Sequence, residues 1–187
     1  MRTTIHAAVA LAAASLTLAI FLVPSPVAAA ERGTRSLGLY GIGLGAGLVD
    51  PEQGSSTLGV LGRLDIGDLG AAMSMHPTVE YWRKSNEVLG IKTTRRDVTA
   101  GLDLHYPLSR GEVRPYLGAG PALHFVRSTV EQGGVTAVDT ATRIGADVLG
   151  GFALQRTRST AWFLEAKYRF VKDQSAFKLF AGLNLGF

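Results

Sequence analysis

The sequence contains no cysteine among its 187 residues, which excludes a disulfide framework. No cysteine is therefore present to carry a lipid anchor after an N-terminal signal. Beyond residue 30, no apolar run is long enough for a membrane-spanning helix. Basic residues are scattered among acids and the net charge is only +4, so nucleic acid is not an expected partner.

The one long apolar run lies at the N-terminus and predicts a signal peptide. Arg2 opens a short polar start, and Ile5–Val23 is almost entirely apolar before two prolines interrupt it. Val27–Ala30 supplies the small residues that a signal peptidase needs, so we predict a signal peptide at 1–30 and one domain at 31–187. The alternative is an uncleaved anchor, but the run is near the lower limit for a span.

The predicted mature chain lacks helical periodicity and alternates apolar with polar residues at every second position. Thr57–Ile66 and Trp162–Phe170 show this period clearly. Together with a glycine-rich stretch at 38–50, the pattern predicts eight strands that begin near residues 38, 57, 71, 97, 116, 143, 162 and 178. Such strands are longer than those of ordinary sheets, whereas about nine to eleven tilted residues cross a bilayer.

The connections alternate in length along the chain. Short connections are predicted at Gly67–Asp68, Pro107–Glu112 and Gln155–Ser159. Longer polar loops are predicted at Asp50–Ser56, Arg83–Lys92 and Ser128–Asp139. This alternation is typical of an up-and-down barrel with one end in the periplasm. We therefore predict an all-β, eight-stranded antiparallel up-and-down transmembrane β-barrel.

The alternation shows that one face is apolar without showing whether that face is inside. The polar face mixes charges of both signs with glycine, which suits a narrow lumen filled by paired side chains. The predicted lumenal charge network is Arg63, Asp65, Glu80, Asp103, Arg143, Asp147, Glu165, Lys167 and Arg169. Aromatics near the ends of the apolar face suit a membrane interface: Tyr81, Tyr106, Phe125, Trp162, Phe170 and Phe187. An ordinary solvated face is the alternative interpretation.

The last strand ends on Phe187, after Leu183 and Leu185 at alternate positions. With the stretch RPYLGAGPALHF at Arg114–Phe125, this ending resembles the small OmpA-type and OmpX-type outer-membrane barrels. The resemblance implies that the terminal residues are the signal read by the barrel assembly machinery.

The same resemblance implies a monomer in the cell outer membrane, in contact with its lipid and lipopolysaccharide and delivered by the secretion machinery. It implies a role in envelope integrity or in surface interaction (adhesion or defence), with an extracellular partner bound through loops. The predicted loops are modest for an adhesin, and the sequence shows no second, peptidoglycan-binding domain.

The glycine-rich stretch also matches a dinucleotide fingerprint, with Gly41, Gly43 and Ala46 as G-x-G-x-x-A and Asp65 further along. That fingerprint needs a helix after the glycines, yet the stretch runs on to Asp50–Pro51. We expect the glycines to line the inner wall of the first strand, where they leave room for long charged side chains.

Catalysis, a metal and a cofactor are not expected. A deacylase-like set would be His124, Ser128 and Glu165, but two residues four apart on a strand are about 13 Å apart. His76 and His105 lie on other predicted strands than His124, without paired-ligand spacing. Eight strands also leave no wide channel. The rival functions are a soluble barrel that binds an apolar ligand and a lipid A-modifying enzyme.

Prolines interrupt three of the predicted strands. Pro77, Pro115 and Pro121 each lack the N–H that a closed ladder needs, so we expect bulges or strand ends at these positions.

Overall fold

The computed structural model describes residues 35–52, 55–70, 73–109, 111–157, 159–172 and 174–187. The predicted signal peptide at 1–30 lies outside these residues. No helix in the described segments is long and apolar enough to cross a membrane. The strands are β1 (Gly41–Pro51), β2 (Thr57–Asp65), β3 (Asp68–Leu69), β4 (Met73–Val88), β5 (Ile91–Pro107), β6 (Val113–Gln132), β7 (Val135–Gln155), β8 (Thr160–Val171) and β9 (Ala176–Gly186).

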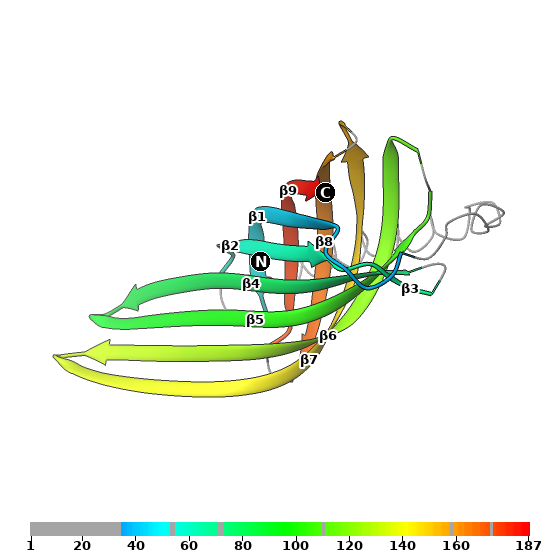
Figure 1. The fold of residues 1–187 in the computed structure, drawn as a ribbon. Helices are drawn as coiled ribbons and strands as arrows, with labels where there is room; N and C mark the ends of the chain where they lie inside the picture. Colours follow the sequence, from blue (N-terminus) through cyan, green and yellow to red (C-terminus); the bar gives the residue numbers. More distant parts are fainter. Residues whose placement is uncertain (1–34, 53–54, 71–72, 110, 158, 173) are drawn as a thin grey trace. The chain divides into compact units, whose positions relative to one another are not determined.

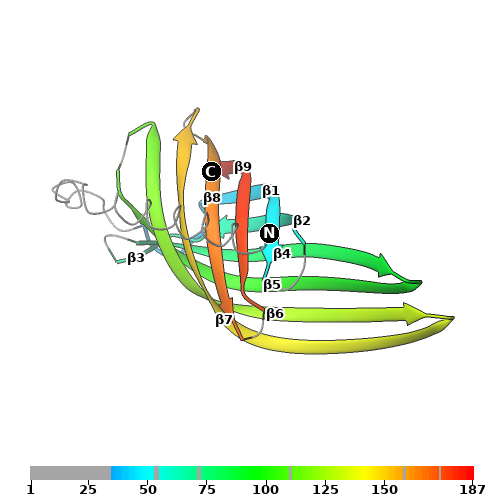
Figure 2. The same cartoon turned by 180° about the vertical axis from the view of Figure 1, so that it is seen from behind.

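The strands form one closed antiparallel barrel (Figures 1 and 2). Each neighbour in the order β2-β1-β9-β8-β7-β6-β5-β4 is hydrogen-bonded, and β2 also pairs with β4 to close the wall. The two-residue β3 continues β2 along β4, so eight strands build the barrel, as the alternation predicts. The first strand, β1, pairs with the last strand, β9, from Gly41 opposite Gly186 to Pro51 opposite Ala176.

The alternation places apolar side chains outside and charge inside. On β8, the outward Trp162 and Phe170 are 52% and 53% exposed, whereas the inward Lys167 is fully buried. The predicted aromatic residues Tyr81, Phe125 and Phe187 are exposed on the same outer face. This arrangement is the reverse of a soluble barrel, which buries its apolar face.

The glycines of β1 line the inner wall, as expected. A Cβ on Gly43 would lie 2.7 Å from Cγ of Arg63, and one on Gly45 would lie 2.8 Å from Cζ of Phe163. The space that these glycines leave is therefore taken by one long charged side chain and one aromatic ring. No helix follows the stretch, because β1 continues to Pro51, and the dinucleotide match is an accident of the two-residue period.

The three prolines have different structural consequences. Pro77 is next to Thr78, where the ladder between β2 and β4 stops. A bulge follows there, because the backbones of both Ile66 and Gly67 hydrogen-bond to the backbone of Met75. Pro115 is close to the start of β6. Pro121 lies within β6, where the β5–β6 ladder is interrupted but resumes in the same register. The expectation of a bulge or strand end is therefore wrong at Pro121: the missing N–H interrupts pairing on one side without shifting it.

Two predicted loops are strands instead. β4 and β5 continue to a turn at Leu89–Gly90, and β6 and β7 continue to a turn at Gly133–Gly134. All four turn residues have positive φ, which is the geometry of the tight turns that join twisted strands. Residues 83–92 and 128–139 form strands that are exposed on both faces. Because neither face is buried, their sequence is polar throughout and resembles that of a loop.

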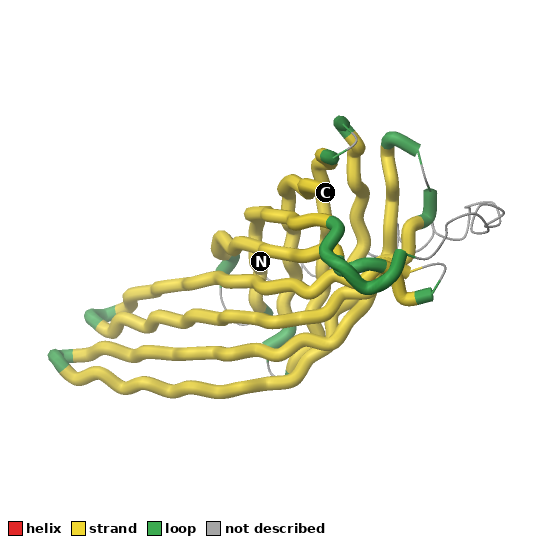
Figure 3. The backbone as a smooth tube through the Cα atoms, in the orientation of Figure 1, coloured by secondary structure: helices red, strands yellow, loops and turns green. Residues whose placement is uncertain are grey.

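The extended hairpins form a four-stranded projection beyond the rest of the barrel. β2 pairs with β4 only as far as Trp82, and β8 pairs with β7 only from Gly145. We call residues 83–96 and 127–144 the protruding sheet. Figure 3 shows these strands running past all the others to short turns at their tips. The expectation of modest loops is therefore wrong: short turns carry a large projecting surface.

Candidate functional site

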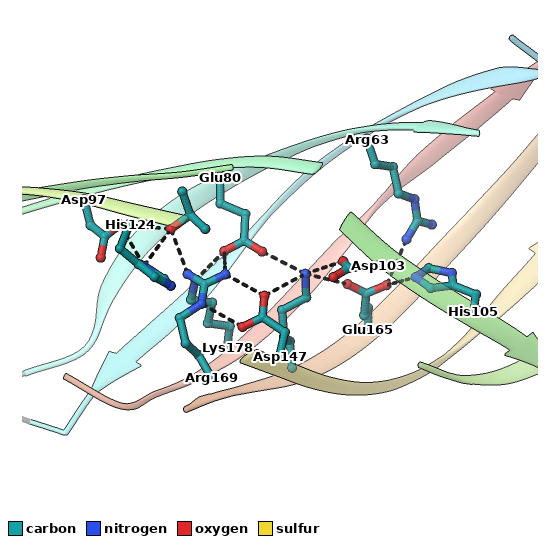
Figure 4. A network of polar contacts seen from close by, with 12 residues as sticks. Arg63, Glu80, Asp97, Asp103, His105, His124, Asp147, Glu165, Arg169 and Lys178 are labelled. Atoms are coloured by element: carbon teal, nitrogen blue, oxygen red, sulfur yellow. Dashed lines mark hydrogen bonds and ion pairs between the residues drawn. The ribbon is translucent and has the colours of Figure 1, made fainter. Parts of the chain in front are cut away.

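The barrel interior holds a network of buried charged side chains, which we call the lumenal charge cluster (Figure 4). The cluster comprises Arg63, Glu80, Asp103, Asp147, Glu165, Lys167, Arg169 and Lys178. These residues come from β2, β4, β5, β7, β8 and β9 and point inward because each takes the polar parity of its strand. The cluster ties most of the wall together through side chains.

Glu80 is the shared anion of the cluster. Its Oε1 accepts a hydrogen bond from Lys167 Nζ at 2.9 Å, and its Oε2 lies 2.9 Å from Arg169 Nη2. Lys178 Nζ donates to the same Oε2. Lys167 and Lys178 are directly opposite each other on β8 and β9, where like charges repel. The carboxylate of Glu80 therefore stabilises two lysines that the strand register forces together.

Asp103 and Asp147 balance the remaining positive charge. Lys167 Nζ donates to Asp103 Oδ2 at 2.6 Å. Arg169 donates through Nε and Nη2 to both carboxylate oxygens of Asp147 at 2.8 Å, the paired geometry that suits a guanidinium. Buried charges are tolerated only with such partners, so the members of the cluster depend on one another.

Arg63 and Glu165 form the end of the cluster nearer the chain termini. Arg63 Nη1 donates to Glu165 Oε2 at 2.8 Å, and the Tyr116 hydroxyl donates to the same oxygen at 2.8 Å. Arg63 Nε also donates to Asn184 Oδ1 at 2.9 Å, and its guanidinium carbon lies 3.9 Å from the centre of the Phe163 ring. The Arg63 side chain therefore packs on an aromatic ring as well as pairing with a carboxylate, and it occupies the space left by Gly43.

A smaller polar group lies toward the protruding sheet. Thr99 Oγ1 donates to Asp97 Oδ1 at 2.9 Å and is 3.1 Å from Nδ1 of His124. Arg169 Nη1 donates to Thr99 Oγ1 at 2.9 Å and so joins this group to the cluster. Thr99, Tyr116 and Asn184 are not among the predicted network residues, although the inward parity of their strands marks them. Ordinary polar residues complete the network that charge alone suggested.

Two predicted network residues lie apart from the cluster. Asp65 ends β2 beside the bulge and pairs with Arg35 at 2.9 Å, and Asp68 pairs with the same guanidinium at 2.8 Å. Hydrogen bonding from Asp68 and from Asp65 raises the pKa of Arg35, which precedes the first strand. Arg143 lies above the last β7–β8 pair and donates to the backbone carbonyl of Lys172 at 2.6 Å. Asp65 and Arg143 therefore lie toward opposite ends of the barrel wall. Their charge and parity alone do not reveal these positions.

A cavity of about 1330 Å³ opens at the end of the barrel that carries Tyr40 and Phe187. His76 and His105 line it with ring centroids 4.2 Å apart and ring planes tilted by 33°. His105 also stacks on Tyr116, with ring centroids 4.7 Å apart. The cavity ends against Arg63, and the buried side chains of the cluster fill the barrel beyond it. It is a vestibule at one end of the lumen.

The candidate catalytic residues belong to separate groups. His124 pairs with Asp97 at 3.5 Å, and Glu165 pairs with Arg63. Ser128 lies four residues beyond His124, on the part of β6 that belongs to the protruding sheet. Within the described segments, no group of three or more acidic or histidine side chains could hold a metal ion.

The C-terminal strand presents the predicted assembly residues on the outer face. Leu185 and Phe187 are exposed, and Leu183 is half-buried between its neighbours. The backbone N–H of Phe187 donates to the carbonyl oxygen of Tyr40 at 3.0 Å, so the terminal residue is held at the β1–β9 seam. Recognition of these residues by the assembly machinery stays a prediction.

An apolar exterior around a charge-filled lumen defines the class of protein: the fold is that of the small eight-stranded outer-membrane β-barrels. Neisserial surface protein A is similar at a TM-score of 0.56 and 22% identity, over 83% of this chain and 100% of that one. A major outer membrane protein of Thermus thermophilus is similar at a TM-score of 0.61 and 11% identity, over 80% of this chain and 98% of that one.

The attachment invasion locus protein Ail of Yersinia pestis, in complex with the heparin analogue sucrose octasulfate, is similar at a TM-score of 0.57 and 10% identity. This likeness covers 81% of the present chain and 100% of Ail. No protein-family model and no curated protein sequence matches the chain. At these identities the likenesses establish the fold.

Proposed function

We propose that this chain is an integral protein of the cell outer membrane with a structural and surface-interaction role and without catalysis. The observation that carries the proposal is the inside-out burial: Lys167, Arg169 and Lys178 are buried in the lumen, while Trp162 and Phe170 are exposed on the wall. In water, this arrangement would expose a continuous apolar belt and would promote aggregation. In a bilayer, the same belt is matched by the lipid.

The proposal predicts a heat-modifiable band in the membrane fraction. Closed barrels with saturated ladders resist detergent, so unboiled protein should migrate differently from boiled protein on a denaturing gel. The measurement is the mobility of the band from separated membrane and soluble fractions, with and without boiling. Recovery in the soluble fraction with unchanged mobility would favour the rival soluble barrel.

The protruding sheet supports surface interaction over a purely mechanical role. It exposes both faces of four strands, and in the described part of the chain the β2–β4 ladder stops at Trp82 and the β7–β8 ladder stops at Gly145. Exposed strand edges and turns supply hydrogen-bonding groups to a partner. The similar Ail carries attachment in its name, which fits a projecting surface of this kind.

The proposal also predicts which end of the barrel faces outward. An epitope inserted between Gly133 and Gly134 should be labelled by antibody on intact cells, because the tight turn lies at the tip of the protruding sheet. The matched control is the same epitope after Thr157, in the short connection at the opposite end. That epitope should be labelled only after the outer membrane is permeabilised. The reverse pattern would contradict the proposed orientation.

A further inference from the structure

Three arginines stand side by side on the outer face of the protruding sheet. Arg83 on β4 is paired with Arg96 on β5, and Arg96 is paired with Arg127 on β6. Residues directly opposite each other in a ladder point to the same side of a sheet. The strands are about 4.8 Å apart, so the three side chains start within roughly 10 Å. We call this set the arginine row.

No carboxylate of the described residues neutralises the arginine row. Like charges directly opposite destabilise a sheet. All three side chains are exposed, and among the described residues none of the three guanidinium groups has a carboxylate within ion-pair distance. By contrast, the opposed Lys167 and Lys178 in the lumen share Glu80. The repulsion between the three arginines would therefore be relieved by an external anion.

The position of the row along the wall indicates where that anion lies. One step toward the barrel on the same face is the exposed row Tyr81, Val98 and Phe125. One step toward the tip is a row of hydroxyl side chains: Ser85, Thr94 and Thr129. The arginines thus mark the boundary between a surface that suits acyl chains and a surface that suits water.

The acids of this face lie further away, at the tips. Glu87, Lys92 and Glu131 form the last row, in which Lys92 and Glu131 are 3.8 Å apart. Charge of opposite sign is therefore available on the same strands but is two rows from the arginines. The arginine row is therefore wholly positive, whereas the last row, with two acids and one lysine, is net negative.

We propose that the arginine row binds the phosphate groups of a phosphorylated lipid in the outer leaflet. Guanidinium forks match phosphate oxygens in pairs, and the adjacent hydroxyls can donate further hydrogen bonds. The apolar row beneath contacts the acyl chains of the same molecule, which selects a lipid over a soluble anion. This inference rests on the proposed membrane location and adds a ligand class and a site to it.

The test compares two triple variants of equal charge change in the refolded full chain. The row variant is R83Q/R96Q/R127Q, and the control variant is R114Q/R156Q/K172Q, whose residues lie outside the row. Binding of diphosphorylated lipid A to the protein in zwitterionic micelles is measured by titration. Parallel titrations use dephosphorylated lipid A, heparin and inorganic phosphate.

The row variant should bind diphosphorylated lipid A at least about tenfold more weakly than the unsubstituted protein, and the difference should shrink as salt is added. The control variant should bind within about twofold of the unsubstituted protein. A third variant, R83K/R96K/R127K, keeps the charge without the fork and should bind with intermediate affinity.

Equal losses in the row and control variants would overturn the proposal, as would equal affinity for dephosphorylated lipid A. Heparin or inorganic phosphate binding as tightly as the lipid would show a general polyanion surface and would also overturn the lipid assignment. Every variant is first checked for the heat-dependent gel shift. An unsubstituted protein that lacks this shift contradicts the proposed function, whereas a row variant that shows the shift and keeps unchanged lipid affinity contradicts only this inference.

Discussion

Replacement of Glu80 by glutamine should lower the free energy of unfolding by about 3–5 kcal/mol. The carboxylate accepts from Lys167 and Lys178 and lies 2.9 Å from Arg169, and all of these groups are buried. Glutamine keeps the shape of the side chain but removes the negative charge. Three buried cations would then face one another with less compensation, two of them directly opposite in the β8–β9 ladder.

The measurement is denaturant unfolding in detergent micelles, followed by tryptophan fluorescence and by the temperature of the gel shift. Glu87→Gln is the matched control, because Glu87 is exposed at the tip of β4 and its loss should change stability by less than about 0.5 kcal/mol. The double variant E80Q/K178Q removes one cation with the anion and should recover part of the loss. If E80Q unfolds at the same denaturant concentration as the unsubstituted protein, Glu80 does not hold the cluster together.

Replacement of Leu164 by arginine should destabilise the folded barrel in a bilayer by about 2 kcal/mol or more. Leu164 lies on the outer face of β8 between Trp162 and Phe170, which are exposed near the two ends of the strand. An arginine there places a charge among acyl chains. In a soluble barrel, the same substitution on an exposed wall would cost little, so this variant separates the two functions directly.

Val138→Arg is the control for this second prediction. Val138 is exposed like Leu164, but it lies on β7 in the protruding sheet, paired with Thr129 and above the arginine row. Its replacement should leave stability nearly unchanged, because water already surrounds it. The measurement is the folded fraction in lipid vesicles over a range of urea concentrations. Equal effects of the two variants would contradict a membrane boundary between these positions.

The two-residue alternation was sufficient to predict most of the interior. Glu80, Lys167 and Arg169 each take the polar parity of a strand, and all three are buried in the cluster. Parity fixes the face of a residue but not its height along the barrel, because height depends on strand tilt and register. Asp65 and Arg143 were therefore assigned to a network from which they are separated, because Asp65 is the last residue of β2 and Arg143 lies beyond the last β7–β8 pair.

The protruding sheet was not predictable from the same signal. Alternation of apolar and polar residues arises only where one face is buried, and residues 83–92 and 128–139 bury neither face. Their polar composition therefore resembles that of a loop. Only the pairing of β4 with β5 and of β6 with β7 shows that these segments are strands. The pairing of β4 with β5 and of β5 with β6 brings Arg83, Arg96 and Arg127 into one row.

The sequence by itself determined an all-β barrel with apolar residues outside and charges of both signs inside. Period two separates an apolar face from a polar one, and charges of both signs beside glycine on the polar face suit a narrow lumen. The tertiary structure decided the partners. Glu80 lies beside Lys178, 98 positions away along the chain, because ladder registers around a closed wall bring distant strands to one level. Register depends on hydrogen bonding between strands, and no pattern within a single strand encodes it.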